Sequence, residues 1–509
     1  MLSIAKSFAL NGLDGYPVNV EVDLHHALPG FVIVGLGDTA VKESHERVRS
    51  AIKNSGFAYP MMKVVANLSP ADVKKEGTHF DLPLAVAVLS ASEQLDYETF
   101  RDFVLLGELS LDGSLQAVNG ILPLLISMRQ RGFKKAVIPK GNEAEAAYVS
   151  DMEIYAMESL RGAVSFFKGE TEARPVARRE WHTSAAEESK YDIKYIKGQF
   201  VAKRAMEIAV AGGHNILLIG PPGAGKTMLA KSVLSILPDM TFDEALEVAK
   251  IHSVAGVLDR KDGILLSRPF RSPHHTASYI ALTGGGQNAK PGEISLAHNG
   301  VLFLDEVPEY SRHSLESLRQ PLEDKVITIA RANKTVTYPA NFMLIASMNP
   351  CPCGNYGSKT KECTCTVTQI QNYLHKLSGP LMDRIDLHVE VDSVSYGELV
   401  SEETAEPSSK VKERINAARA VQAERFTGQD IRTNSQMSAQ LTKKYCALDG
   451  KGNALMESAF RNLQLSARAR DRILKVARTI ADLEGSADIA AKHVAEAVQY
   501  RSLDKKYRV

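Results

Sequence analysis

The 509-residue chain has few of the residues and segments that mark secreted or membrane proteins. It contains five cysteines, a sparse and odd number that argues against a disulfide framework. The most apolar stretch, residues 82–91, is far shorter than the roughly 20 residues that a membrane-spanning helix needs. Residues 1–6 lack the layout of a signal peptide. These absences predict a cytoplasmic protein that has no membrane partner.

A large excess of one charge is also missing. The chain has 61 Lys and Arg residues against 60 Asp and Glu residues, which gives a net charge of +1. No overall field therefore attracts nucleic acid, and a DNA contact has to come from a local patch or a pore. At 509 residues the chain is too long for one hydrophobic core, so we expect several domains.

What the sequence does contain is a phosphate-binding loop. Apolar residues 216–219 predict a buried strand, and residues 220–227 match the pattern G-x-x-x-x-G-K-[ST]. The glycines let backbone N–H groups surround an anion, Lys226 offers a cation for the outer phosphates, and Thr227 offers a hydroxyl for Mg²⁺. The predicted nucleotide-binding residues are Gly220, Pro221, Pro222, Gly223, Ala224, Gly225, Lys226, Thr227 and Met228. ATP and Mg²⁺ are the expected ligands.

Two more apolar strands end in polar residues that suit this chemistry. Residues 301–304 lead into Asp305 and Glu306, and residues 342–348 lead into Asn349. The carboxyl ends of central parallel strands face the ligand crevice of such sheets. We expect Asp305 to hold Mg²⁺, Glu306 to polarise the attacking water, and Asn349 to orient that water.

Two arginines complete the predicted catalytic set. Arg384 lies well beyond the predicted sheet, which suits an arginine aimed at the nucleotide of a neighbouring subunit. Arg468 opens a long helical stretch, from which it would reach the γ-phosphate as part of a helical lid. An ordinary surface or salt-bridged side chain is the alternative for each. The predicted catalytic residues are Lys226, Asp305, Glu306, Asn349, Arg384 and Arg468.

Four of the cysteines form two C-x-C pairs separated by turn-forming residues. If the turn folds back, Cys351, Cys353, Cys363 and Cys365 bring together four thiolates, which suit tetrahedral Zn²⁺. Zinc sites more often use C-x-x-C pairs, so reduced free thiols are the alternative. The fifth cysteine, Cys446, lies far away in the sequence and is expected to be buried.

Residues 1–168 alternate predicted strands and helices and have no phosphate loop, which predicts an α+β domain. Residues 75–83, 113–122 and 137–143 resemble the proteolytic domain of Lon-type proteases. In that family a nucleophilic serine and a lysine occupy the positions that carry His79 and Leu122 here. Without this pair the acyl-transfer route is closed, so we expect the fold without protease activity.

Taken as a whole, the chain resembles the AAA+ ATPases, and among them the magnesium-chelatase-like family called ComM or YifB. Besides the motifs above, the resemblance is carried by residues 212–215, 270–276, 291–294, 297–300 and 477–483. It implies that Asn349 is sensor 1, Arg384 an arginine finger acting on a neighbouring subunit, and Arg468 sensor 2. It also implies a hexameric ring motor on DNA with a role in branch migration during natural transformation.

The expected fold is a multidomain α/β protein. It has an N-terminal α+β domain like that of Lon (S5-like), a central AAA+ nucleotide-binding domain with a parallel sheet, and a C-terminal helical lid. The predicted boundaries are 1–168 for the Lon-like domain, 169–195 for a linker, 196–395 for the ATPase core with the cysteine cluster, 396–437 for a connector and helix, and 438–509 for the lid.

Related AAA+ helicases aim a β-hairpin at DNA, and this chain has a candidate. Residues 326–331 and 335–338 alternate like two paired strands. We predict that Arg331 and Lys334, next to the turn, contact DNA phosphates; a hairpin that only faces solvent is the alternative. Gly284, Gly285 and Gly286 are a second candidate, as a flexible loop at the pore of a ring.

The predicted function is therefore an ATP-hydrolysing ring motor on single-stranded or branched DNA, a helicase or branch-migration factor. The alternative is the ATPase subunit of a magnesium-chelatase-type or MoxR-like complex that remodels a protein partner. Both use the same nucleotide motifs, so these motifs do not separate the two functions.

Overall fold

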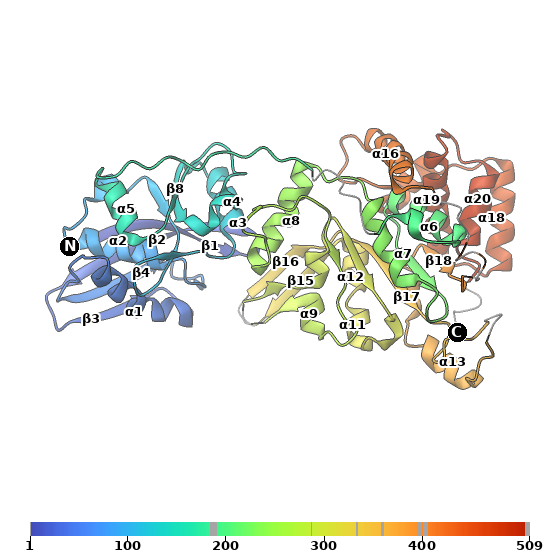
Figure 1. The fold of residues 1–509 in the computed structure, drawn as a ribbon, viewed down its shortest axis with the longest axis horizontal. Helices are drawn as coiled ribbons and strands as arrows, with labels where there is room; N and C mark the ends of the chain where they lie inside the picture. Colours follow the sequence, from blue (N-terminus) through green and yellow to red (C-terminus); the bar gives the residue numbers. More distant parts are fainter. Residues whose placement is uncertain are drawn as a thin grey trace.

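The computed structural model describes residues 2–183, 191–286, 288–331, 334–357, 361–394, 397, 400 and 406–503. Its three parts follow one another along the long axis of the molecule (Figure 1). The N-terminal domain is blue, the central domain green and yellow, and the C-terminal helices orange and red. Part of the predicted linker 169–195, the turn of the predicted hairpin and most of residues 395–405 in the predicted connector lie outside the described residues.

A seven-stranded mixed sheet forms the N-terminal domain. Its spatial order is β3 (Gly30–Val34), β4 (Lys63–Ser69), β2 (Asp14–His25), β1 (Leu2–Asn11), β5 (Phe103–Leu105), β8 (Lys135–Pro139) and β9 (Glu153–Met157). A small antiparallel pair, β6 (Glu108–Leu109) and β7 (Leu115–Gln116), lies apart from it. In β2 the apolar Val18, Val20 and Val22 are fully buried and alternate with more exposed residues, the pattern of a strand with one face in the core.

One helix of this domain is apolar on all sides and fills the core. Every residue of α2 (Asp81–Ala91) is buried, as expected for a helix without a polar face, and it packs on β1 and β2. The other helices are α1 (Thr39–Asn54), α3 (Ile121–Gln130), α4 (Glu143–Ala146) and α5 (Leu160–Phe167).

A five-stranded sheet, parallel throughout, forms the central domain. Its spatial order is β11 (Phe270–Arg271), β14 (Val301–Leu304), β17 (Met343–Met348), β10 (Ile216–Ile219) and β18 (Leu387–Glu390). Residues of β10 alternate between two hydrophobic cores: Ile216 and Leu218 face one, Leu217 and Ile219 the other. Burial on both faces explains why these strands read as continuous apolar runs.

Helices and two short antiparallel ribbons surround this sheet. The helices are α6 (Phe200–Gly212), α7 (Lys226–Ser232), α8 (Phe242–Ala255), α9 (Tyr279–Thr283), α10 (Glu293–Leu296), α11 (Arg312–Glu316), α12 (Arg319–Asp324), α13 (Val367–Leu374) and α14 (Gly379–Met382). The ribbons are β12 (Gly284–Gly285) with β13 (Lys290–Pro291), and β15 (Val326–Arg331) with β16 (Lys334–Pro339). The second ribbon confirms the predicted hairpin.

The C-terminal part is helical, as predicted. It consists of α16 (Ser408–Arg425), α17 (Ala439–Tyr445), α18 (Gly450–Asn462), α19 (Ala467–Leu483) and α20 (Ala491–Gln499). Apolar residues of α16 and α19 share one hydrophobic core with α6 and with one face of the central sheet. The helices are therefore packed onto the nucleotide-binding domain by a common core.

The N-terminal domain is also packed directly on the central domain. Apolar residues of α3 and α8 share a hydrophobic core, and Ser253 Oγ donates to Glu145 Oε2 over 2.8 Å. The backbone N–H of Gly120 donates to the carbonyl of Ser253. Within the predicted linker, Val176 N–H donates to the carbonyl of Ile154, so this segment is held against β9. Among the described helices, none has both the length and the hydrophobicity that a membrane span requires.

Candidate active site

The central sheet brings the nucleotide motifs to one edge. The phosphate loop follows β10, Asp305 follows β14, and Asn349 follows β17, and these strands are neighbours and parallel. All three motifs therefore lie at the carboxyl edge of the sheet, where parallel sheets bind ligands.

Lys226 lies at the centre of this edge and is almost fully buried. Its ammonium donates to the carbonyls of Gly220 and Pro221, over 2.7 and 2.9 Å, and to Asn349 Oδ1 over 3.0 Å. Burial lowers the pKa of Lys226, and the charge of Asp305 opposes that shift. Because these three acceptors are uncharged oxygens, a buried positive charge faces the place where phosphates are expected.

The predicted Mg²⁺ ligands contact each other directly. Thr227 Oγ1 donates to Asp305 Oδ2 over 2.8 Å. The other carboxylate oxygen, Oδ1, accepts hydrogen bonds from Ser347 Oγ and from the backbone N–H of Glu306. The sequence analysis did not identify Ser347, although its position near the end of β17, two residues before Asn349, was a usable signal.

The glycines leave room for an anion. Gly223 and Gly225 have positive φ angles of 79° and 86°, and an added Cβ atom at either position meets only open space. At these two positions no neighbouring atom crowds the backbone of the loop, which leaves its N–H groups accessible to an anion. The residues of the phosphate loop fit a nucleoside triphosphate. Thr227 and Asp305 together fit a hard cation that prefers oxygen ligands.

Glu306 adopts the left-handed backbone conformation, with φ at 52°. For a residue with a side chain this costs about 1–3 kcal/mol, and such strain is concentrated at functional sites. Its Oε2 lies 3.8 Å from Nδ1 of His275. His275 reaches the carboxyl edge because it follows β11, which is parallel to β14 and ends at the same edge. His275 is the second residue of this site that the sequence did not reveal.

The two predicted arginines lie at the opposite edge of the sheet. The carbonyl of Arg384 accepts from Asn215 Nδ2, and Asn215 immediately precedes β10. Strands of four residues are about 13 Å long, so the amino and carboxyl edges are well separated. Arg384 and Arg468 line one cavity of about 150 Å³, and no phosphate-loop residue contributes to it. The structure therefore groups Lys226, Asp305, Glu306 and Asn349, and places the two arginines together elsewhere.

A buried ion-pair network holds this amino edge in place. Asp386 is almost fully buried and binds Arg472 of α19, His214 and the backbone N–H of Asn215. Burial alone would raise the pKa of Asp386, but Arg472 and His214 outweigh burial and hold it well below its usual value. Arg384 Nη2 pairs with Glu323 Oε2 over 2.7 Å. The network fixes α19 to the sheet and orients the neighbouring arginines.

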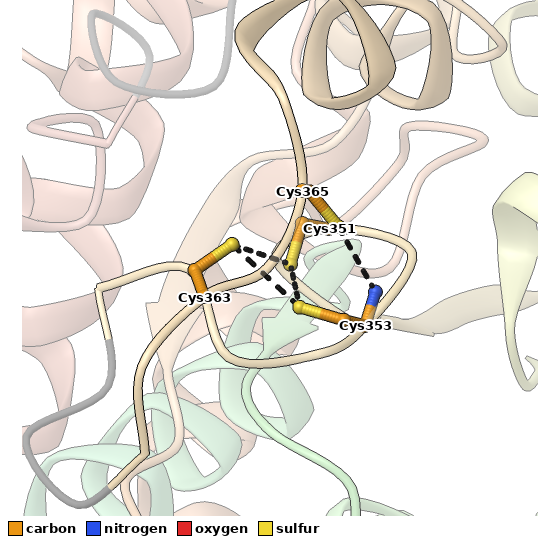
Figure 2. A group of neighbouring side chains, drawn as sticks. All are labelled: Cys351, Cys353, Cys363 and Cys365. Carbon is orange, nitrogen blue, oxygen red and sulfur yellow. Dashed lines mark hydrogen bonds between the residues drawn. The ribbon is translucent and has the colours of Figure 1, made fainter.

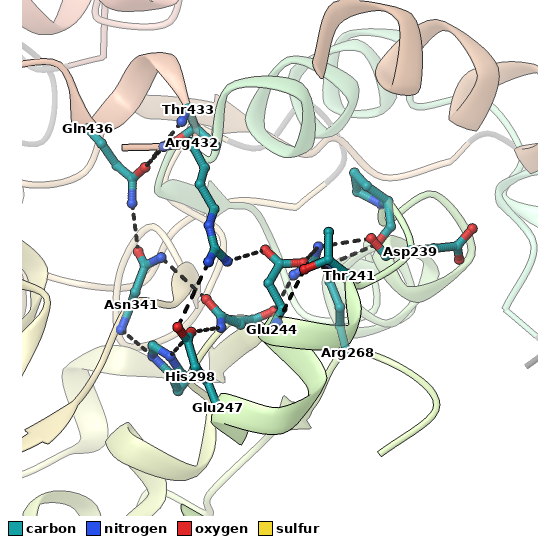
Figure 3. A network of polar contacts seen from close by, with 12 residues as sticks. Asp239, Thr241, Glu244, Glu247, Arg268, His298, Asn341, Arg432, Thr433 and Gln436 are labelled. Carbon is teal, nitrogen blue, oxygen red and sulfur yellow. Dashed lines mark hydrogen bonds and ion pairs between the residues drawn. The ribbon is translucent and has the colours of Figure 1, made fainter. Parts of the chain in front are cut away.

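A second polar network links three parts of the chain (Figure 3). Arg432, in the loop between α16 and α17, pairs with Glu244 of α8 over 2.7 Å. His298 lies 3.3 Å from Glu247, whose pKa is lowered to about 2 by this contact. His298 Nδ1 also accepts the backbone N–H of Asn341. His298 therefore orders the backbone at Asn341. Helix α8, which also contacts the N-terminal domain through Ser253, connects that domain to the C-terminal helical part.

The predicted DNA contacts lie on the hairpin. Arg331 is exposed at the end of β15, and its guanidinium lies against Gly285 of the neighbouring ribbon. The backbone of Lys334 begins β16, while the turn between the two lies outside the described residues. Gly284 and Gly285 are buried in β12, and a Cβ atom on Gly284 would lie 2.4 Å from the carbonyl oxygen of Lys290. The predicted flexible loop at these two glycines is thus wrong, because close backbone packing requires them.

In the N-terminal domain His79 and Leu122 are both core residues. His79 Nε2 donates to the carbonyl of Phe8 over 2.9 Å, and burial lowers the pKa of His79 to about 4. Leu122 is fully buried in the core shared by α3 and α8. Neither position carries the serine hydroxyl or the lysine amine of the Lon-type pair.

The four clustered cysteines do meet. Their Sγ atoms all lie within 4.8 Å of one another in the loop between β17 and α13. Cys446 is buried apart from them, as predicted, and burial raises the pKa of its thiol to about 12.

Family models match most of the chain. One described as magnesium chelatase, subunit ChlI, matches residues 192–399; subunit ChlI of Mg-chelatase matches 20–142, and the ChlI C-terminal model matches 405–501. The chain is also 44% identical over 508 residues to competence protein ComM of Haemophilus influenzae, covering 99% of this chain and 98% of that relative. The chain belongs to the ComM/YifB family.

This family is magnesium-chelatase-like, and the chain is also similar to the following relatives. The uncharacterized protein YifB of Escherichia coli is 42% identical over 506 residues, covering 99% of this chain and 98% of the relative. The chloroplastic magnesium-chelatase subunit ChlI of Oryza sativa subsp. japonica is 24% identical over 293 residues, covering 49% of this chain and 65% of the relative. Membership implies an AAA+ ATPase that uses ATP and Mg²⁺. The likeness of residues 1–168 to Lon-type domains stays a prediction.

Proposed function

We propose that this protein is a ring-forming, ATP-driven motor that moves on single-stranded or branched DNA. The observation that carries the proposal is the pairing of a complete nucleotide edge with full-length similarity to a protein named for competence. The family resemblance implies DNA as the track and a hexamer as the working form. The near-zero net charge directs the search for DNA contacts to local features such as Arg331 and Lys334.

The proposed chemistry begins with the phosphate loop. Lys226 and the backbone N–H groups after Gly223 hold the outer phosphates, while Thr227 and Asp305 hold Mg²⁺. When bound, Mg²⁺ neutralises charge on the β- and γ-phosphates. Glu306 accepts a proton from the attacking water, and Asn349 orients that water next to Lys226.

The position of the two arginines explains why ATP hydrolysis would need a ring of subunits. In one chain Arg384 and Arg468 lie at the sheet edge opposite to the phosphate loop. We propose that the amino edge of one protomer faces the carboxyl edge of the next, so that both arginines act on a neighbour's γ-phosphate. Heterologous head-to-tail contacts of this kind close into rings. Hydrolysis at one interface then couples adjacent protomers during movement on DNA.

The experiment is ATP turnover measured without DNA, with single-stranded DNA and with branched DNA. DNA is expected to stimulate ATP hydrolysis. Lys226→Ala is expected to abolish hydrolysis, whereas Lys231→Ala on the same helix is a matched control that should keep it. Chloroplastic ChlI is named as a chelatase subunit, and a partner-remodelling complex is the competing function. Stimulation by a protein partner but not by any DNA would establish that competing function and overturn the motor.

A further inference from the structure

The loop that follows β17 carries a compact cluster of four thiols (Figure 2). Sγ of Cys351 lies 3.4 Å from Sγ of Cys353 and 3.7 Å from Sγ of Cys363. Sγ of Cys353 and Sγ of Cys363 are 3.6 Å apart, and Cys365 lies next to the backbone of Cys353. Cys351 is fully buried and the others are partly exposed.

These distances are those of a single metal ion rather than of disulfides. A disulfide needs sulfur atoms about 2.05 Å apart. A tetrahedral Zn²⁺ ion about 2.3 Å from each of four sulfurs places the sulfurs about 3.8 Å from one another. The observed separations of 3.4, 3.6 and 3.7 Å are close to that value. The cluster is too compact for the several metal atoms and bridging sulfides of an iron–sulfur cluster.

The backbone around the cluster supports negatively charged sulfur. The N–H of Tyr356 donates to Cys351 Sγ over 3.3 Å, and the N–H of Cys353 donates to Cys365 Sγ over 3.4 Å. Such outer hydrogen bonds orient metal ligands and stabilise thiolates. Gly354, with φ at 80°, makes the turn that returns the chain toward the second cysteine pair.

The same loop contacts the nucleotide edge at two points. Cys351 lies two residues after Asn349, and Asn349 Oδ1 accepts a hydrogen bond from Lys226. Gly354 packs against Pro222 of the phosphate loop so closely that an added Cβ would lie 2.4 Å from Pro222 Cδ. The thiol cluster is therefore connected both to Asn349 and to the phosphate loop, the two segments whose oxygens contact the Lys226 ammonium.

We propose that Cys351, Cys353, Cys363 and Cys365 bind one Zn²⁺ ion, and that this ion positions Asn349 and the phosphate loop for nucleotide binding. The zinc ion fixes the turn between Cys351 and Gly354. This turn then holds Asn349 and Pro222 of the phosphate loop in place. The zinc site stands on its own geometry, whereas its effect on nucleotide rests on the proposed ATPase function. Because coupling between two binding sites is reciprocal, bound nucleotide must change zinc affinity by the same factor as zinc changes nucleotide affinity.

The first test is metal content by elemental analysis, after the full-length protein is reconstituted with ZnCl₂ under reducing conditions and desalted. We expect about one zinc per chain, the stoichiometry of a four-thiolate site. Cys363→Ser is expected to lose that zinc, whereas Cys446→Ser, which alters the buried cysteine outside the cluster, is expected to retain it. Absence of stoichiometric zinc, or equal zinc in both variants, would overturn the site.

The second test measures zinc affinity by chelator competition, with and without a non-hydrolysable ATP analogue. We expect the apparent Kd for zinc to change at least about fivefold, the lower end of typical coupling between sites. Pro222→Ala, which removes the contact with Gly354 but leaves every cysteine, is expected to keep one zinc and reduce this coupling. An identical zinc Kd with and without nucleotide, in protein shown to bind both, would overturn the positioning role. That result would leave the ATPase proposal intact, whereas failure of the unmodified, zinc-loaded protein to bind ATP would overturn the ATPase itself.

Discussion

The two edges of the central sheet are built in opposite ways. At the carboxyl edge the buried Lys226 ammonium contacts uncharged oxygens and faces an open, glycine-lined space. At the amino edge the buried Asp386 carboxylate is fully engaged by Arg472 and His214. Among the described residues, the Lys226 ammonium has no carboxylate within ion-pair distance, although the charges of Asp305 and Glu306 act on it, whereas the Asp386 carboxylate is already paired. The difference favours a carboxyl edge that binds a ligand and an amino edge that acts as a scaffold, and we propose that this scaffold presents Arg384 and Arg468 to a neighbouring subunit.

The largest expected effect comes from removing the arginine that the amino edge presents. In Arg384→Ala we expect ATP hydrolysis to fall about 10³–10⁵-fold, the range found for arginine fingers, with little change in ATP affinity. The reason is that, in the proposed ring, Arg384 acts on the γ-phosphate of a neighbour, whereas it lies away from the phosphate loop of its own chain. Steady-state turnover and nucleotide titration measure the two quantities. Arg461→Ala, on an exposed helix surface, is the control, and normal turnover in Arg384→Ala would remove the amino edge from the mechanism.

A smaller loss is expected when the base of the carboxyl edge is removed. Glu306→Gln keeps the size of the side chain but cannot accept a proton, so we expect turnover to fall about 10²–10⁴-fold. ATP should remain bound, because Lys226 and the loop backbone are unchanged. Trapped nucleotide after gel filtration and steady-state turnover provide the measurement. Glu309→Gln, at the exposed last residue of the 3₁₀ turn Val307–Glu309, should behave like the unmodified protein. Equal losses in both variants would argue against a specific role for Glu306.

Asp386→Asn tests the scaffold instead of the chemistry. Breaking a buried ion pair leaves Arg472 uncompensated and should lower the free energy of unfolding by about 3–5 kcal/mol. Since the folded-state pKa of Asp386 is lowered, its stabilisation is present above the unfolded pKa of about 3.9 and is lost as the pH falls below it. The variant should therefore lose part of the acid sensitivity of the unmodified protein. Urea denaturation at several pH values measures this, and Asp471→Asn, at a half-exposed position of α19, should change stability by less than about 0.5 kcal/mol.

The smallest effect is expected outside both edges, on the hairpin. Lys334→Ala should weaken DNA binding by a few-fold and reduce the salt dependence of log K by about one ion, because one phosphate contact is removed. ATP hydrolysis without DNA should not change. Fluorescence anisotropy at several salt concentrations measures the slope. A slope identical to that of the unmodified protein would remove Lys334 from the DNA contacts.

Much of this arrangement could be predicted from the sequence, because local patterns determine it. The apolar runs ending in the phosphate loop, Asp305 and Asn349 predict parallel strands, and neighbouring parallel strands necessarily bring their ends together. The hairpin followed in the same way from the alternation of its two strands.

What could not be predicted depends on contacts between distant segments. His275 reaches Glu306 because it follows β11 at the carboxyl edge, and a strand of two residues is too short to be recognised in the sequence. Gly284 looked like a mobile glycine, yet the tertiary packing of Lys290 requires it. The location of Arg468 next to Arg384 follows from how α19 docks through Arg472 and Asp386, a pair separated by 86 positions in the chain.

The most direct test of the two-edge account uses rings that contain both Lys226→Ala and Arg384→Ala protomers, co-purified through two different affinity tags. Each variant alone is expected to be inactive. A mixed ring has about one interface in four that combines an intact phosphate loop with an intact arginine from the next protomer, so ATP hydrolysis should recover to roughly that fraction. Assembled mixed rings that bind ATP and recover no hydrolysis would contradict the claim that ATP is cleaved between protomers.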